Sequence, residues 1–381
     1  MQLRRPLALT ALGLGLAAAA APPAAAFFSP EEQNAGALLR VFSDSDQVLV
    51  RSMVGGYTLV LPRNAAFDLQ YNNERVTIPA IDAPVGSQEA VDAITTASRP
   101  ITGNAGYEDY VKVRDEFTGV LRAMGASVEY YHSSESDYLG QMLGVSYARD
   151  FMNQQFNLSV GTSYGWDRID PLADDDTATG EDEKNTVHWN VVATQVLTPT
   201  TQMRVGVEVN RVEGLQHNPY RNVYAGGTNV PERHPDARDR RDAFVKLSQY
   251  LPNRSSLRLH YRYYTDDWGI DSHEIATGLS QYITGGVFAR YEYRYYTQTP
   301  ARFYREEYES TDGIGGYLTG DYRMADLSSH LLAASLSFDL ATLAADHGLL
   351  RHFALRFDYE RYFNSNNYSA NILETGLDFR F

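Results

Sequence analysis

Apolar and polar residues alternate along many stretches of this 381-residue chain. In "LRLHYRYY" at 257–264, Leu257 and Leu259 share one face with two tyrosines, while the other face carries Arg258, His260 and Arg262. The closing stretch "ILETGLDFRF" shows the same period of two. This period is typical of β-strands with one apolar face. A tilted strand of about ten residues is long enough to cross the hydrocarbon of a membrane.

The alternation predicts an all-β fold, a transmembrane antiparallel up-and-down β-barrel closed by the strand that ends at Phe381. About fourteen strands are expected, with 12 or 16 as alternatives. The expected strands are 47–61, 65–78, 116–132, 137–150, 155–168, 186–198, 201–213, 241–251, 255–266, 271–283, 286–298, 327–341, 352–363 and 369–381.

A soluble β-sandwich would also alternate, but the faces opposite the apolar ones carry Arg, Glu, Asp and His. Such charges are costly to bury in a dry core and cost little in a wet barrel lumen. The chain also holds 27 tyrosines, and aromatic rings with a polar tip suit the membrane–water interface. The pattern therefore favours the barrel over the sandwich.

The ends and connections give an orientation. Residues 1–26 resemble a cleaved secretory signal, with Arg4 and Arg5 before an apolar run and small residues up to Ala26. A periplasmic segment with a short helix is expected over 27–46, followed by the barrel over 47–381.

This orientation places both termini in the periplasm of a Gram-negative bacterium. Long extracellular loops are then expected at 169–185, 214–240 and 299–326, with short turns on the periplasmic side. An insert at 79–115 falls on the periplasmic side, with a short helix near 87–97 that would act as a plug or a docking element.

Charge and cysteine content narrow the partners. The formal net charge is −15, which disfavours nucleic acid, and the absence of cysteine excludes disulfides and thiol chemistry. Expected partners are outer-membrane lipid, lipopolysaccharide, the barrel-assembly machinery and small solutes. Phe379 and Phe381 are the expected assembly signal at the end of the last strand.

Charged residues of the late strands form the candidate lumen wall. Rings of charge along a pore set its selectivity for charged solutes. The alternative is that these side chains pair with one another and fill the barrel, and the sequence leaves both open. The set is Arg258, His260, Arg262, Glu274, Arg290, Glu292, Arg294, Arg356, Asp358 and Glu360.

Two further motifs carry weaker signals. The acidic stretch "DPLADDDTATGEDEK" at 170–184 could hold Ca²⁺ or Mg²⁺, but its spacing does not match an EF-hand and a solvated loop is favoured. Its candidate ligands are Asp174, Asp175, Asp176, Glu181 and Glu183.

His188, His260 and His330 lie on expected strands near Ser and Asp residues, which raises a hydrolase as an alternative. No G-x-S-x-G elbow accompanies them. We therefore expect no enzymatic activity and no cofactor.

Several stretches resemble a family of uncharacterised predicted bacterial outer-membrane proteins, a domain of unknown function within the porin-like class. They are "EAVDAITTASRP" at 89–100, "YYHSSESDYLG" at 130–140, "VSYARDFMNQQFNLSVGTSYGWDRI" at 145–169 and the closing "ETGLDFRF". The resemblance implies the barrel fold and the outer-membrane location, and it implies no activity.

Two functions follow as expectations. The first is a passive or gated pore for small charged solutes, based on the charged lumen wall. The second is a plugged structural barrel that anchors periplasmic or surface partners, based on the insert at 79–115 and the long loops.

Overall fold

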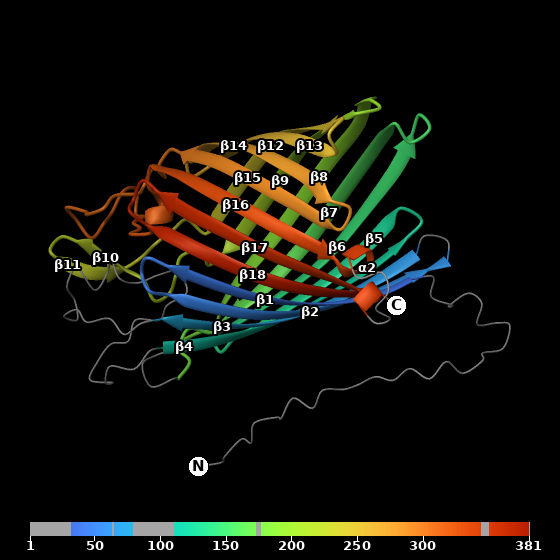
Figure 1. Cartoon of the computed structure of the whole chain (residues 1–381). Coiled ribbons are helices and arrows are strands. Elements are labelled where there is room, and N and C mark those ends of the chain that lie inside the picture. The colour runs from blue at the N-terminus through green and yellow to red at the C-terminus, as the bar shows by residue number, and fades with distance from the viewer. Residues whose placement is uncertain (1–31, 63–64, 79–109, 173–176, 344–349, 381) are drawn as a thin grey trace, which may run out of the picture.

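The chain forms a closed antiparallel β-barrel of 16 strands in a computed structural model that describes residues 32–62, 65–78, 110–172, 177–343 and 350–380 (Figure 1). The strands are β1 (Glu32–Asp44), β2 (Leu49–Leu61), β3 (Ala65–Ile78), β4 (Tyr110–Ala123), β5 (Ala126–Ser134), β6 (Tyr138–Phe151), β7 (Phe156–Ile169), β8 (Asp182–Thr198), β9 (Thr201–Gly214), β12 (Ala237–Leu251), β13 (Ser255–Asp266), β14 (Asp271–Thr284), β15 (Val287–Gln298), β16 (Leu327–Asp339), β17 (Phe353–Asn364) and β18 (Ser369–Arg380).

Closure depends on the first strand. β1 pairs with β2 on one side and with β18 on the other, so that Leu39 lies opposite both Met53 and Thr375. Each remaining strand pairs antiparallel with its neighbours in the barrel, which leaves no open edge to recruit another chain. Among the described residues, no helix has the length and apolar character of a membrane span.

The predicted barrel fold is confirmed. The main prediction of about fourteen strands is wrong, and the observed 16 strands match one of the two alternatives. The helix expected within 27–46 is strand β1 instead. Leu38 and Phe42 lie on its inner face beside Arg40, so its two faces do not separate cleanly by polarity. Pairing with β18, at the opposite end of the chain, stabilises it as a strand.

The second missing strand comes from the stretch expected as one strand at 116–132. Two strands occupy it, β4 and β5, joined by Met124 and Gly125 with φ of 52° and 84°. Ala123 and Ala126 pair directly across this turn. Two central residues with positive φ match the twist of the flanking strands, which is why a tight hairpin forms there.

The two ends of the barrel differ in their connections. One end carries the long segments between strands, including the small sheet of β10 (Asn222–Ala225) and β11 (Thr228–Pro231) at the left of Figure 1. The other end carries short turns such as 152–155 and 199–200, the C-terminus, and a longer connection at 340–352 with α2 (Leu340–Leu343) and η4 (Leu350–His352). This asymmetry is typical of outer-membrane barrels.

Two expectations about connections change. Residues 110–115 of the expected insert belong to β4, and the rest of it, with the helix expected near 87–97, lies outside the described residues. β3 ends and β4 begins at the end with the long loops, so placing the insert with the short turns is wrong. The error follows from the missed strand β1, which reverses the direction of β2 and β3.

The outer face of the barrel is apolar. Leu259, Trp189 and Leu373 are 47%, 58% and 56% exposed, and many other large apolar side chains point outward with them. A soluble protein does not expose a continuous apolar surface of this extent to water. The outer face is therefore the lipid-facing surface of a membrane barrel.

Candidate pore lumen and its capped end

The inner face carries the charges that the alternation predicts. Along β13, Leu257, Leu259 and Tyr261 are exposed on the outer face, and the residues between them point inward. The strand registers extend this assignment of inward and outward side chains to β14, β15 and β17. All ten predicted lumen residues lie on the inner face: Arg258, His260, Arg262, Glu274, Arg290, Glu292, Arg294, Arg356, Asp358 and Glu360.

Most of the ten belong to ion pairs along the wall. Arg258 Nη2 lies 2.6 Å from Glu292 Oε2, and Arg356 Nε lies 2.7 Å from Asp358 Oδ2. Glu274 lies 3.3 Å from His260 Nδ1 and 3.7 Å from an Arg294 nitrogen. Arg262 pairs with Asp242 of β12, which the sequence did not single out. Arg290 and Glu360 have no ion pair within the described part of the chain.

These pairs lie on a wet surface rather than in a dry core. The side chains of Arg258, Arg262 and Arg356 are 41%, 42% and 45% exposed, although they point into the barrel. Charges with this much access to water cost little to keep. The lumen at this level is lined by hydrated charged groups rather than filled by packed side chains.

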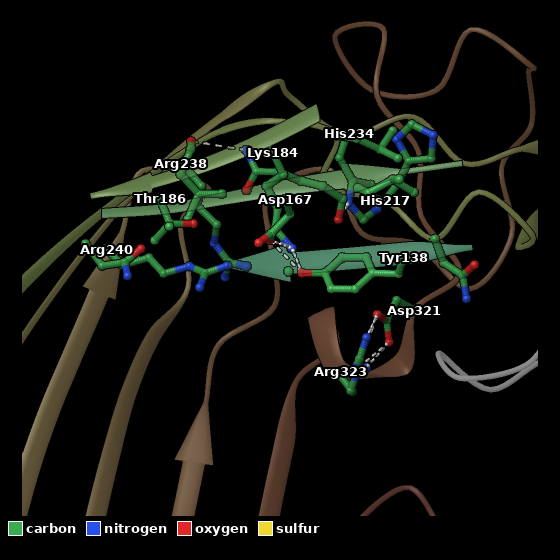
Figure 2. Close-up of a pocket in the computed structure, with 18 of the residues that line it drawn as sticks. Tyr138, Asp167, Lys184, Thr186, His217, His234, Arg238, Arg240, Asp321 and Arg323 are labelled. Atoms are coloured by element: carbon green, nitrogen blue, oxygen red, sulfur yellow. Dashed lines mark hydrogen bonds and ion pairs between the residues drawn. The ribbon is translucent and has the colours of Figure 1, made fainter. Parts of the chain in front are cut away.

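A large polar cavity of about 1140 Å³ lies toward the end of the lumen with the long loops. Figure 2 shows side chains converging on it from the barrel wall and from the loops. On one side Asp167 accepts hydrogen bonds from Tyr138 at 2.6 Å and from Lys184 at 2.9 Å. Asp321 and Arg323 of the 299–326 loop form another part of the lining.

The loops above the cavity form a folded cap with its own core. Val223 and Ala225 of β10 pack with Tyr308 and Leu318 of the 299–326 loop, and all four are buried. The Tyr308 hydroxyl donates to the carbonyl of Phe303 at 2.5 Å and accepts from a backbone N–H at 2.8 Å. The two longest described loops thus behave as one packed unit.

Buried charges hold the cap together. Arg221 Nη1 lies 3.0 Å from Asp321 Oδ2, with side chains only 2% and 5% exposed. Burial alone would raise the pKa of Asp321, but hydrogen bonds from Arg323 and the charge of Arg221 lower it to about 2. Asp321 therefore stays ionised and ties loop 215–236 to loop 299–326.

Glu232 makes the second tie between the loops. Its Oε1 accepts a hydrogen bond from Thr319 Oγ1 at 2.9 Å and another from the backbone N–H of Gly320 at 3.0 Å. Burial raises the pKa of this carboxyl to about 7. His234 Nε2 lies 3.8 Å from its other oxygen, and burial lowers the pKa of that imidazole to about 4.

The cap meets the barrel wall around Trp268. Arg238 donates to Asp266 at 2.9 Å through Nε and stacks over the Trp268 ring at 4.3 Å. The indole N–H of Trp268 donates to the carbonyl of Ala237 at 2.9 Å. Sequence reasoning missed Arg238 because 214–240 was expected to be a loop, whereas β12 begins at Ala237. Extending the alternation backward from 241 would have found Arg238 and Arg240.

The acidic stretch gives no metal site among the described residues. Asp174, Asp175 and Asp176 lie outside them, so that candidate set is incomplete. Glu181 is exposed, and Glu183 lies within β8, opposite Arg168 of β7. The loop expected over 169–185 is therefore shorter, because β7 extends to Ile169 and β8 begins at Asp182.

The three candidate histidines do not come together. His188 faces Glu208 at 3.5 Å and His260 faces Glu274, both on the inner wall. His330 lies on the outer face, where its Nδ1 is 2.9 Å from the Tyr293 hydroxyl. No histidine–serine pair joins them within the described residues, so the geometry offers no nucleophile and base for hydrolysis.

Of the two residues of the expected assembly signal, the structure describes Phe379. Phe379 lies 4.8 Å, between ring centroids, from Phe353 at the end with the short turns. Phe381 lies outside the described residues, so the assembly role of both stays a prediction.

Solved structures with a similar fold include two proteins of Pseudomonas aeruginosa, OpdK and PfeA. OpdK with vanillate is 8% identical at a TM-score of 0.44, covering 92% of this chain and 98% of the other. A double mutant of OccD1 (OprD) is 9% identical at 0.46, covering 92% and 95%. A mutant of the ferric enterobactin receptor PfeA is 12% identical at 0.45, covering 86% and 53%. Likenesses this distant carry no argument about activity.

No curated protein matches the chain. The family described as "Protein of unknown function (DUF3570)" matches residues 21–359, which is most of the sequence. This agrees with the resemblance inferred from the sequence stretches quoted above. The chain therefore belongs to the family of proteins of unknown function DUF3570.

Proposed function

We propose that this chain is an outer-membrane pore for small charged solutes and has no enzymatic activity. The observation that carries the proposal is the wet, charged inner wall that leads into a cavity of about 1140 Å³. A barrel filled by packed side chains would leave Arg258 and Arg356 far less than 41% and 45% exposed. Charged walls of this kind discriminate between permeating ions.

The orientation follows the same reasoning. Outer-membrane barrels place short turns in the periplasm and long loops outside. We place the start of β1 and the end of β18 in the periplasm. The folded cap then lies at the cell surface. Lipopolysaccharide would then surround the capped end, and the assembly machinery would engage the end that carries Phe379.

The cap suggests how passage is controlled. It is a packed unit held by buried ion pairs, so it restricts entry from its side without filling the lumen below. We propose that solutes enter past this cap and meet the charged wall in the cavity beneath it. Whether the pore stays open or is gated depends on the stability of the cap.

Single-channel recording in planar bilayers tests the proposal. Purified protein, checked for heat-modifiable mobility, is expected to give steady current steps in potassium chloride. A correctly folded but silent barrel would overturn the pore and favour a structural barrel that anchors partners. A variant with Arg258 and Arg262 replaced by Gln should conduct with a shifted preference toward cations.

A further inference from the structure

The cations that line the cavity are almost all neutralised by the protein itself. Six of them have a carboxylate within ion-pair distance. Lys112 reaches Asp137 at 2.8 Å, and Lys184 reaches Asp167 at 2.9 Å. The remaining pairs are Arg114 with Glu74, Arg238 with Asp266, Arg262 with Asp242, and Arg323 with Asp321.

Arg240 of β12 is the exception among the described residues lining the cavity. Within the described part of the chain Arg240 forms no ion pair and no hydrogen bond, and its Nε atom is buried without an acceptor. Its neighbour on the same face, Arg238, is already committed to Asp266. A buried N–H donor such as this Nε is costly without an acceptor, because water no longer satisfies it.

The residue opposite Arg240 has a hydrogen-bond acceptor that lacks a donor. Asn210 of β9 pairs with Arg240 in register, and both line the cavity. The Asn210 side-chain oxygen is buried without a hydrogen-bond donor. Directly opposed residues on neighbouring strands have Cβ atoms about 5 Å apart, so one small molecule can touch both. The site offers donors from arginine and an acceptor from asparagine.

We propose that Arg240 and Asn210 form a subsite for a small hydroxycarboxylate in the lumen. The carboxylate accepts hydrogen bonds from the Arg240 fork, which suits a planar anion. The hydroxyl donates to the Asn210 oxygen. This inference rests on the proposed pore function and names the class of solute that the pore favours.

Lactate is the test probe, and propionate is the matched probe that lacks the hydroxyl. Reversal potentials are measured in gradients of each potassium salt across planar bilayers. Arg240→Gln is expected to lower the lactate-to-potassium permeability ratio about tenfold. Asn210→Ala is expected to lower the ratio for lactate and to leave the ratio for propionate unchanged.

Arg254→Gln is the control for the loss of an arginine charge. Arg254 is exposed in the turn between β12 and β13, at the end of the barrel opposite the cavity, and it does not line the cavity. Its loss should change the ratio less than about twofold, because exposed charges interact weakly. Equal effects of Arg240→Gln and Arg254→Gln would overturn the subsite and leave the pore standing.

A binding measurement separates the subsite from the pore. Trp268 lines the same cavity and lies under Arg238, so its fluorescence reports on occupancy. With Trp166 and Trp189 replaced by Phe, lactate should change the emission saturably in detergent, and Arg240→Gln should abolish the change. Saturable lactate binding by a folded barrel that conducts no current would support the subsite and contradict the pore. No saturable change in a conducting barrel would overturn the subsite.

Discussion

Arg258 and Glu292 lie two strands apart and meet across the glycine between them. Their side chains approach to 2.6 Å over Gly278 of β14, which is in register with both. A Cβ at Gly278 would lie 3.2 Å from Arg258 Nη2. The missing side chain therefore lets an ion pair span three strands of the inner wall.

This pair should contribute little to stability. Its side chains are 41% and 32% exposed, and ion pairs in such settings are worth about 0–1 kcal/mol. Arg258→Gln should lower the free energy of unfolding, measured by urea titration in lipid vesicles, by less than about 1 kcal/mol. A loss several times larger would mean that the wall is a structural network. Glu292→Gln serves as the reciprocal variant.

The buried pair in the cap should behave in the opposite way. Asp321→Asn removes the carboxylate shared by Arg221 and Arg323, and it leaves the buried Arg221 without that partner in a site almost closed to water, whereas Arg323 is half exposed. Breaking such a pair costs on the order of 3–5 kcal/mol. We expect the cap to open and trypsin to cut at Arg302 and Arg305 while the barrel stays folded.

Asp312→Asn is the control for this experiment. Asp312 is exposed in the same loop and has only a short-range contact with Ser310. Its tryptic pattern should match the parent protein. If Asp321→Asn is cut no faster than Asp312→Asn, the buried ion pairs do not hold the cap.

The lumen wall could be predicted from sequence because alternation is a local property. Once Leu257 and Leu259 face outward, Arg258 must face inward, whatever the partner strand. The pairing of Arg258 with Glu292 depends on the register of three strands, which alternation does not encode. The inner face was therefore predictable and its ion pairs were not.

Strand β1 and the cap could not be predicted for a different reason. Inward Leu38 blurs the alternation of β1, whose pairing with β18 joins the two ends of the chain. The tie between Arg221 and Asp321 joins two loops that have no periodic pattern at all. Such contacts arise from tertiary packing and leave no local signal in the sequence.

The proposed orientation can be tested because the chain contains no cysteine. Glu309→Cys places a thiol on the exposed surface of the cap, and Asn253→Cys places one on an exposed short turn at the opposite end. On intact cells an impermeant maleimide should label the first variant and not the second. Both should react after lysis, and the reverse pattern would invert the orientation.

Assembly should depend on the last strand. Phe379 packs against Phe353 at the end of the barrel where β18 closes onto β1. Deleting Phe381, two residues after Phe379 in the sequence, should reduce the heat-modifiable barrel recovered from outer membranes. Asn366→Ala, in an exposed turn at the far end of β18, should assemble normally. Equal recovery of the two variants would remove Phe381 from the assembly signal.

The stability of the cap should depend on pH through Glu232 and His234. Burial raises the pKa of Glu232 from 4.5 to about 7, so ionising it costs stability as the pH rises between these values. Burial lowers the pKa of His234 from 6.5 to about 4, so protonating it costs stability as the pH falls between these values. The two slopes have opposite signs and largely cancel between about pH 4.5 and 6.5.

Single substitutions should reveal the separate pH dependence that each of the two groups gives to the stability of the cap. Without His234, as in His234→Gln, the cap should weaken as the pH rises from about 4.5 to 7, by on the order of 2–3 kcal/mol. Without Glu232, as in Glu232→Gln, the cap should strengthen as the pH rises from about 4 to 6.5. Trp268, whose ring centroid lies 5.3 Å from that of His234, reports cap opening by its emission in urea. The same pH slope in both variants would show that other groups control the cap.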